Sequence, residues 1–171
     1  MDTRHTLVSG ALAVAMAVTG GVLASSPASA KRTPKPLKVV DAHVTVDDGT
    51  PGVLEQGDSF DIVLDKQVMV YAPSFTVLVT DADGDPAYLS DNGSEISYSL
   101  EDLVTYDKKG RATVSPDRVL AVTIRDAYGG LVPLDLPVTI TSIQGVYYAG
   151  QYDEPARVDL VRSPDTVIDA E

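Results

Sequence analysis

Short apolar segments, separated by clusters of turn-forming residues, run from residue 37 to the end of the chain and constrain its fold more than any other feature. Two of them, residues 59–64 and 75–80, place an apolar side chain at every second position: Phe60, Ile62 and Leu64, then Phe75, Val77 and Val79. A period of two predicts strands with one buried face. Five further segments of this kind are residues 39–46, 95–100, 118–125, 137–143 and 156–161.

The turn clusters between these segments are rich in Asp, Gly and Pro, which favour tight turns. Residues 99–104 are expected to form at most one helical turn, so no helix is long enough to cover a parallel sheet. In residues 39–46, we expect one face to carry Val40, Ala42, Val44 and Val46. The predicted fold class is therefore all-β, an antiparallel β-sandwich of about seven to nine strands.

The first thirty residues have the pattern of an export signal. Arg4 lies in a short polar head, residues 7–24 are mostly apolar, and Ala28-Ser29-Ala30 fits the A-x-A cleavage pattern. Gly20-Gly21 interrupts the apolar run, which is too weak for a stable membrane span. We therefore expect a cleaved signal peptide at 1–30, a basic, Pro-rich linker at 31–36, and a single domain at 37–171.

Composition narrows the classes of partner. The chain has 13 basic and 25 acidic residues, a formal net charge of −12, and no cysteine. Such an acidic surface repels phosphate backbones, so we expect no nucleic-acid partner. After cleavage of the signal, no second apolar stretch is long enough to hold the protein in a membrane. Without disulfides, the domain must be stabilised by packing alone.

Three stretches of the sequence are similar to one family. They are Asp47-Asp48-Gly49-Thr50-Pro51-Gly52-Val53 with Gly57-Asp58, then Thr80-Asp81-Ala82-Asp83-Gly84-Asp85, then Leu136-Pro137-Val138-Thr139-Ile140 with Gly145-Val146-Tyr147. This order resembles the immunoglobulin-like modules of secreted and cell-surface bacterial proteins, including S-layer proteins. The resemblance covers about residues 38–169. It implies an immunoglobulin-like sandwich that acts outside the cell.

A catalytic serine is the first candidate for chemistry. Gly57-Asp58-Ser59 matches the nucleophile triplet of the serine esterases named for a Gly-Asp-Ser-Leu block. A serine nucleophile needs a histidine as its general base. The single histidine after the signal is His43, which lies upstream in a predicted strand, and residues 150–171 contain none. We therefore interpret the triplet as a turn entering a strand and expect no enzyme.

An aspartate-rich loop is the second candidate. Asp81, Asp83 and Asp85 are spaced like the start of a calcium-binding loop. The helix–loop–helix version requires Gly at its sixth position and Glu at its twelfth, where this chain has Pro86 and Asn92. We favour a turn in which the aspartates bind backbone amides, and leave calcium bound between sandwich loops as the alternative. No other cofactor is expected, because His43 and Met69 alone make no zinc or copper site.

The tyrosines supply the predicted binding residues. Tyr147, Tyr148 and Tyr152 cluster beside Gly145 and Gly150, and tyrosine offers an apolar ring together with a hydroxyl for protein or sugar contacts. We predict a binding loop here. Four other tyrosines are expected in the core or in cross-strand pairs: Tyr71, Tyr88, Tyr98 and Tyr106.

These observations favour a secreted, non-catalytic binding or adhesion module that acts at the bacterial cell surface or in the extracellular matrix. Its expected partner is a protein or a cell-wall polysaccharide. One alternative is a calcium-stabilised structural or assembly module without a dedicated ligand. A less favoured alternative is a small glycan-active hydrolase with paired carboxylates. The sequence does not indicate the oligomeric state.

Overall fold

The computed structural model describes residues 34–71, 74–92, 95–125, 133–151 and 153–169. The chain divides into Met1–Thr33 and Pro34–Glu171, and all described residues belong to the second unit. The predicted signal peptide, residues 31–33 of the predicted linker, and Tyr152 lie outside the described residues. The described part contains strands and one short 3₁₀ helix, η1 (Leu160–Arg162), and no α-helix. The prediction of an all-β fold is confirmed.

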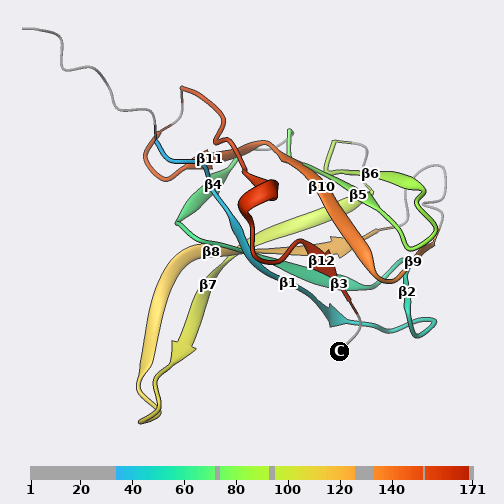
Figure 1. Ribbon diagram of the computed structural model, residues 1–171, viewed down its shortest axis with the longest axis horizontal. Coiled ribbons are helices and arrows are strands. Elements are labelled where there is room, and N and C mark those ends of the chain that lie inside the picture. The colour runs from blue at the N-terminus through green and yellow to red at the C-terminus, as the bar shows by residue number, and fades with distance from the viewer. Residues whose placement is uncertain (1–33, 72–73, 93–94, 126–132, 152, 170–171) are drawn as a thin grey trace, which may run out of the picture. The chain divides into compact units, whose positions relative to one another are not determined.

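Two four-stranded antiparallel sheets form the body of the fold (Figure 1). The first contains, in order across the sheet, β1 (Val39–Val46), β3 (Ser59–Leu64), β8 (Ala112–Ile124) and β7 (Ile96–Tyr106). The second contains β12 (Val167–Ile168), β10 (Val138–Gln144), β5 (Thr76–Thr80) and β6 (Pro86–Ser90). Two antiparallel pairs complete the set: β2 (Val53–Leu54) with β9 (Leu134–Asp135), and β4 (Val68–Val70) with β11 (Val146–Tyr148).

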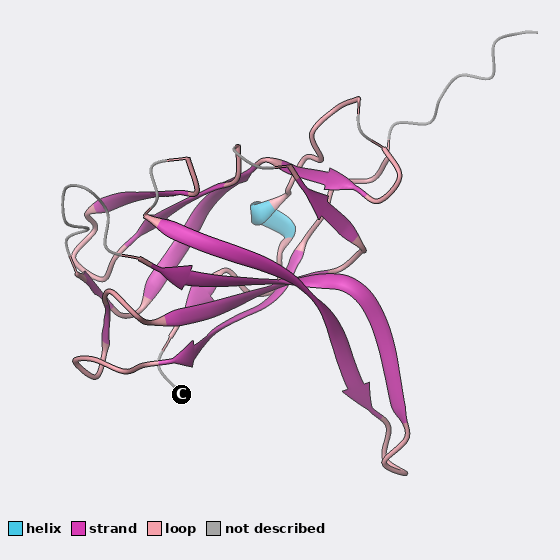
Figure 2. Ribbon diagram, turned by 180° about the vertical axis from the view of Figure 1, so that it is seen from behind, coloured by secondary structure: helices cyan, strands magenta, loops and turns pink. Residues whose placement is uncertain are grey.

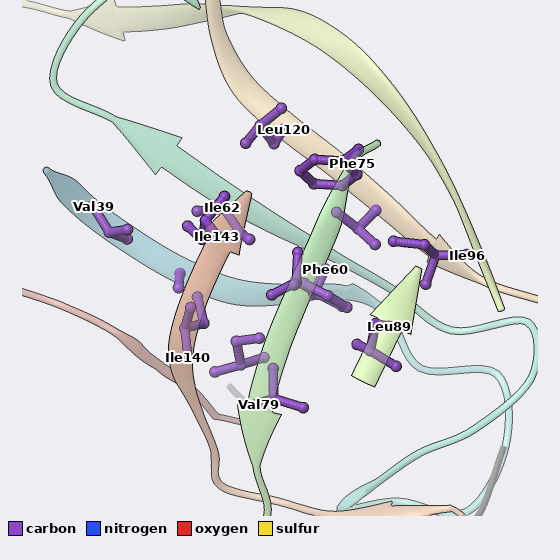
Figure 3. Packing of buried hydrophobic residues seen from close by; sticks show 14 of the residues in the cluster. Val39, Phe60, Ile62, Phe75, Val79, Leu89, Ile96, Leu120, Ile140 and Ile143 are labelled. Carbon is purple, nitrogen blue, oxygen red and sulfur yellow. The ribbon is translucent and has the colours of Figure 1, made fainter. Parts of the chain in front are cut away.

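One hydrophobic cluster joins side chains of both sheets, which gives the fold its β-sandwich-like character (Figure 3). The alternation in residues 59–64 and 75–80 predicted its centre correctly. Phe60, Ile62, Leu64, Phe75, Val77 and Val79 are all buried. Burying one such side chain stabilises a fold by about 1.5–3 kcal/mol, so these two strands are major contributors to the stability of the core.

The predicted face of residues 39–46 is wrong in part. Val39 and Ala42 are buried, whereas Val46 is exposed. The pairing of β1 with β3 shifts register between Val39 and Asp41 and again between Val44 and Val46. Each irregularity changes which side chains face the core, and a strict alternation in the sequence does not reveal it.

Two other expectations need correction. Residues 156–161 do not form the last strand: the segment makes an isolated bridge between Leu37 and Val158 and then enters η1, and the final strand is β12. Residues 99–104 form no helical turn, because they lie within β7. Both β7 and β8 are longer than the sequence predicted, and together they extend beyond the sheet as a two-stranded hairpin (Figure 2).

Candidate functional site

The candidate binding site lies on the small β4–β11 sheet, and Gly145 positions it. This glycine separates β10, which pairs with β5, from β11, which pairs with β4. Its φ is 76°, a conformation that favours glycine, and a Cβ here would lie 2.7 Å from the Cα of Phe75. The Gly145 carbonyl also accepts a hydrogen bond of 3.2 Å from the Tyr71 amide. Gly145 therefore fixes where the chain leaves the large sheet and meets β4.

An apolar hollow of about 210 Å³ opens on this sheet, lined by Met69, Val70, Tyr71 and Tyr147. Tyr147 is directly opposite Met69 in the β4–β11 pairing, so both side chains lie on one face. The rings of Tyr71 and Tyr147 meet edge to face, with their centroids 6.4 Å apart. Tyr71 nevertheless remains 65% exposed. The hollow thus presents aromatic, thioether and aliphatic surface to solvent.

The neighbouring tyrosine, Tyr148, has a different environment. It packs against the hydrophobic core, and its hydroxyl donates a 2.8 Å hydrogen bond to the carbonyl of Lys35. The Lys66 ammonium lies 5.7 Å from the centre of its ring, within the range of a cation–π contact. Burial, with a smaller contribution from the Asp65 carboxylate, raises the pKa of Tyr148. The hydrogen bond from Tyr148 therefore connects β11 to Lys35, near the first described residue.

The structure thus gives different environments to two of the three tyrosines that the sequence grouped together. Tyr147 lines the hollow, Tyr148 supports it from the core side, and Tyr152 lies outside the described residues. Adjacent residues of a strand point to opposite faces, and 147 and 148 lie in β11 rather than in a loop. Sequence reasoning missed Met69, Val70 and Tyr71, because their partner strand is more than seventy residues away along the chain.

The four tyrosines expected in the core or in cross-strand pairs also differ in their environments. Tyr98 packs on Phe75, with 4.7 Å between the ring centroids, as expected of a core-facing residue. Tyr88 and Tyr106 are exposed, although each occupies a cross-strand pair, opposite Leu78 and Ala112 respectively. Tyr71, in contrast, is neither buried nor in a strand.

The aspartate loop at 81–85 is a turn organised by its first carboxylate. Asp81 Oδ1 accepts hydrogen bonds from the amides of Asp83 (3.1 Å) and Asp85 (2.8 Å). Asp83 and Asp85 themselves are exposed. Among the described residues, no group of three or more His, Cys, Asp or Glu side chains is arranged to hold a metal ion. Calcium binding at Asp81, Asp83 and Asp85 stays a prediction.

The Gly57-Asp58-Ser59 triplet also forms a turn that enters a strand, since β3 begins at Ser59. Asp58 is fully buried; its Oδ1 accepts from the Asp48 amide (2.9 Å) and its Oδ2 from the Glu55 amide (2.7 Å). The Ser59 hydroxyl pairs with that of Thr123 at 2.9 Å. The triplet therefore anchors the loop between β1 and β3.

Charged side chains gather on the outer face of the first sheet. His43 lies opposite Asp61 in the β1–β3 pairing, and its Nδ1 is 3.1 Å from the Asp41 carboxylate. Burial is the main cause that raises the pKa of Asp61; His43 lowers it, whereas Glu101 and Asp41 raise it. These groups belong to an open sheet face and contribute no residue to the hollow on β4 and β11.

No helix in the described part of the chain is long and apolar enough to cross a membrane. Comparison of the sequence and the structure with protein-family models, curated proteins and solved structures found no match.

Proposed function

We propose that this protein is a secreted, non-catalytic binding module that recognises a partner protein outside the cell by taking one of its apolar side chains into the hollow on β4 and β11. The observation that carries the proposal is the hollow itself, with Tyr71 and Tyr147 at solvent-accessible positions. Binding hot spots are enriched in aromatic residues that contribute to such apolar pockets.

The size and lining of the hollow favour a single side chain as its occupant. Pockets for whole small-molecule ligands have volumes of about 300–1,000 Å³, and this one is smaller. Its lining residues supply apolar surface and two tyrosine hydroxyls, and none of them is a carboxylate. An aliphatic or aromatic side chain of a protein matches this lining better than a polysaccharide, which needs several hydrogen-bonding partners, and a hydrolase would need paired carboxylates.

The strand order supports the immunoglobulin-like part of the proposal. The sheets β1-β3-β8-β7 and β12-β10-β5-β6 correspond to the orders A-B-E-D and G-F-C-C′ when the eight strands are lettered along the chain. Immunoglobulin-like domains place A, B, E and D in one sheet and C, F and G in the other. Domains of this architecture present binding residues at strand edges and in loops, as the β4–β11 site does.

Export is the part of the proposal that rests on residues 1–30. Their polar head, apolar stretch and Ala28-Ser29-Ala30 ending have the order of a secretory signal. Secretion would place the domain at the cell surface or in the surrounding matrix. The absence of cysteine from the whole chain is compatible with this location, because the core contains a large set of buried apolar side chains and needs no disulfide.

A capture experiment tests the proposal. The purified protein is immobilised and exposed to proteins from the producing cells' envelope and culture fluid, alongside Tyr71→Ala/Tyr147→Ala. We expect the wild type to retain a specific protein that the double variant loses. Tyr88→Ala is the matched control, since Tyr88 is similarly exposed but lies on β6. Equal retention by wild type and the double variant would contradict the proposal. Retention of a polysaccharide and of no protein would mean that the partner is a polysaccharide rather than a protein.

A further inference from the structure

The hairpin of β7 and β8 projects beyond the sheet and carries exposed apolar side chains. β3 pairs with β8 only as far as Val119, whereas β7 and β8 remain paired out to Tyr106 and Ala112. We call residues 101–118 the arm. Val104 and Val114 lie directly opposite each other, and Tyr106 shares their face. Their exposed fractions are 45%, 56% and 71%.

A bulge at the base of the arm sets its direction (Figures 1 and 2). Between the pairs Glu101–Val119 and Leu103–Ser115, the single residue Asp102 faces three residues of β8. One of these, Asp117, has a φ of 48°, and its amide donates to Asp102 Oδ1 at 3.2 Å. Bulges of this kind bend a strand and change its direction.

Two further hydrogen bonds attach the base to the body of the fold. Gln67 Nε2 donates to Asp117 Oδ2 at 3.0 Å, and Arg118 Nε donates to the carbonyl of Leu64 at 2.7 Å. The arm is thus held at its base, although its outer part packs against no third strand among the described residues. An isolated two-stranded hairpin is only marginally stable in water, so pairing with a further strand would stabilise the arm.

The arm also has opposite charges at its two ends. The turn at 107–111 contains Asp107, Lys108, Lys109 and Arg111, a net charge of +2 in a chain whose total is −12. The base contains Glu101, Asp102, Asp117 and Arg118, a net charge of −2. Within the turn, Arg111 is paired with Asp107 at 2.7 Å, which leaves Lys108 and Lys109 as its outward charges among the described residues.

We propose that two copies of this chain associate through their arms, with the free edges of β7 paired antiparallel about Thr105. Among the described strands, β7 is the last of its sheet, so its outer edge offers unpaired backbone groups to another strand. Pairing about Thr105 places Val104 of one copy beside Tyr106 of the other. It also places the acidic base of each arm beside the basic turn of the other.

The charges of the arm favour a second copy of this chain as the partner, with the two β7 strands antiparallel. A two-fold axis brings the same surface of two identical chains together, and such a surface must be self-complementary. The arm fulfils this condition, because its +2 turn meets a −2 base at both ends of the paired region. A parallel pairing would instead place base against base and turn against turn, where like charges repel. The association uses the arm alone and is independent of the binding hollow proposed above.

Charge-swap variants test this association by sedimentation velocity at low salt. One variant is Lys108→Glu/Lys109→Glu, and the other is Glu101→Lys/Asp102→Lys. We expect the wild type to dimerise and each variant alone to be monomeric, because base and turn then carry the same sign. An equimolar mixture of the two variants should restore dimers, since the charges are complementary again. The wild-type dimer should also weaken as salt screens the charges.

A matched control for Glu101→Lys/Asp102→Lys makes the same +4 change of net charge elsewhere in the chain. Asp47→Lys/Glu154→Lys alters exposed residues outside the arm, and Asp47 follows the end of β1 farthest from the arm's base. This control should dimerise like the wild type, and circular dichroism and melting should show that every variant is folded. A wild type that stays monomeric at about 1 mM, a dimer that survives both swaps, or a mixture that fails to restore dimers would overturn the proposal.

Discussion

At the scale of single residues, the buried carboxylate of Asp58 organises the loop between β1 and β3. Each of its oxygens accepts one backbone amide, from Asp48 and from Glu55. Asp58→Ala removes both hydrogen bonds, and a hydrogen bond to a charged group contributes about 1.5–3 kcal/mol. We expect the free energy of unfolding, measured with urea, to fall by about 2 kcal/mol or more. Asp83→Ala, at an exposed position, should change it by less than about 0.5 kcal/mol.

The raised pKa of Asp61 predicts how the stability of the fold depends on pH. Its pKa in the folded protein is raised above 3.8, mainly by burial, so the folded state binds its proton more tightly than the unfolded state does. Its contribution to stability is therefore present below pH 3.8 and is lost as the pH rises through the raised pKa. Asp61→Asn should melt at a higher temperature than wild type at pH 7, and the difference should shrink toward pH 3. A constant difference at every pH would contradict this assignment.

Gly145 provides a test of the local geometry behind the binding hollow. Gly145→Ala introduces both a strained positive φ and a clash with the backbone at Ser74 and Phe75. We expect a loss of stability of about 2 kcal/mol or more. Gly150→Ala is the matched control: its φ is 77°, but nothing lies within 4 Å of the added Cβ. Equal losses in the two variants would show that the close packing of Gly145 has no energetic consequence.

At the scale of elements, the arm should contribute little to the stability of the fold. Its apolar side chains are exposed rather than part of the core. Replacing residues 104–114 by Asn-Gly joins Leu103 to Ser115 through a two-residue turn that suits a hairpin. We expect the melting temperature of this variant to stay within a few degrees of wild type, equivalent to less than about 1 kcal/mol. A large drop in melting temperature would mean that the arm is needed for folding. In sedimentation velocity, this variant should be monomeric.

The elements also show which parts of the structure can be predicted from sequence. Phe60, Ile62 and Leu64, and likewise Phe75, Val77 and Val79, are buried at alternate positions, and a buried face leaves a clear period of two in the sequence. The arm buries neither face, so residues 101–106 mix charged and apolar side chains and resemble a helical turn as much as a strand. β4 has three residues, and its partner β11 is distant in sequence, so neither carries a readable period.

At the scale of the whole molecule, the predicted all-β class is confirmed, and the predicted binding site at Tyr147, Tyr148 and Tyr152 stays a prediction. The turn clusters and alternating segments were sufficient for two antiparallel sheets around one core. One residue of the predicted tyrosine segment, Tyr147, lines the hollow. Its other lining residues come from β4 and the residue that follows it, and only the tertiary pairing of β4 with β11 brings them together. Long-range pairings of this kind leave no local signal.

The calcium-stabilised alternative makes a separate prediction for the molecule as a whole. If a calcium ion bound at Asp81, Asp83 and Asp85 stabilised the domain, a chelator would lower its melting temperature, and Asp83→Asn would remove that effect. In the structure, Asp81 Oδ1 accepts hydrogen bonds from the amides of Asp83 and Asp85 within the turn. We therefore expect Asp81→Ala to destabilise the turn in the presence or absence of chelator, by about 1 kcal/mol, as followed by thermal melting.

The central claim, that a partner side chain occupies the hollow on β4 and β11, can be tested with a single reporter. The chain has three methionines, Met1, Met16 and Met69, and Met69 lines the hollow. In protein labelled with ¹³C at the methionine methyls, the Met69 signal is assigned with Met69→Leu. Addition of the partner retained in the capture experiment should shift the Met69 signal of the wild type and of Tyr88→Ala. A captured partner that leaves the Met69 signal unchanged would contradict the account.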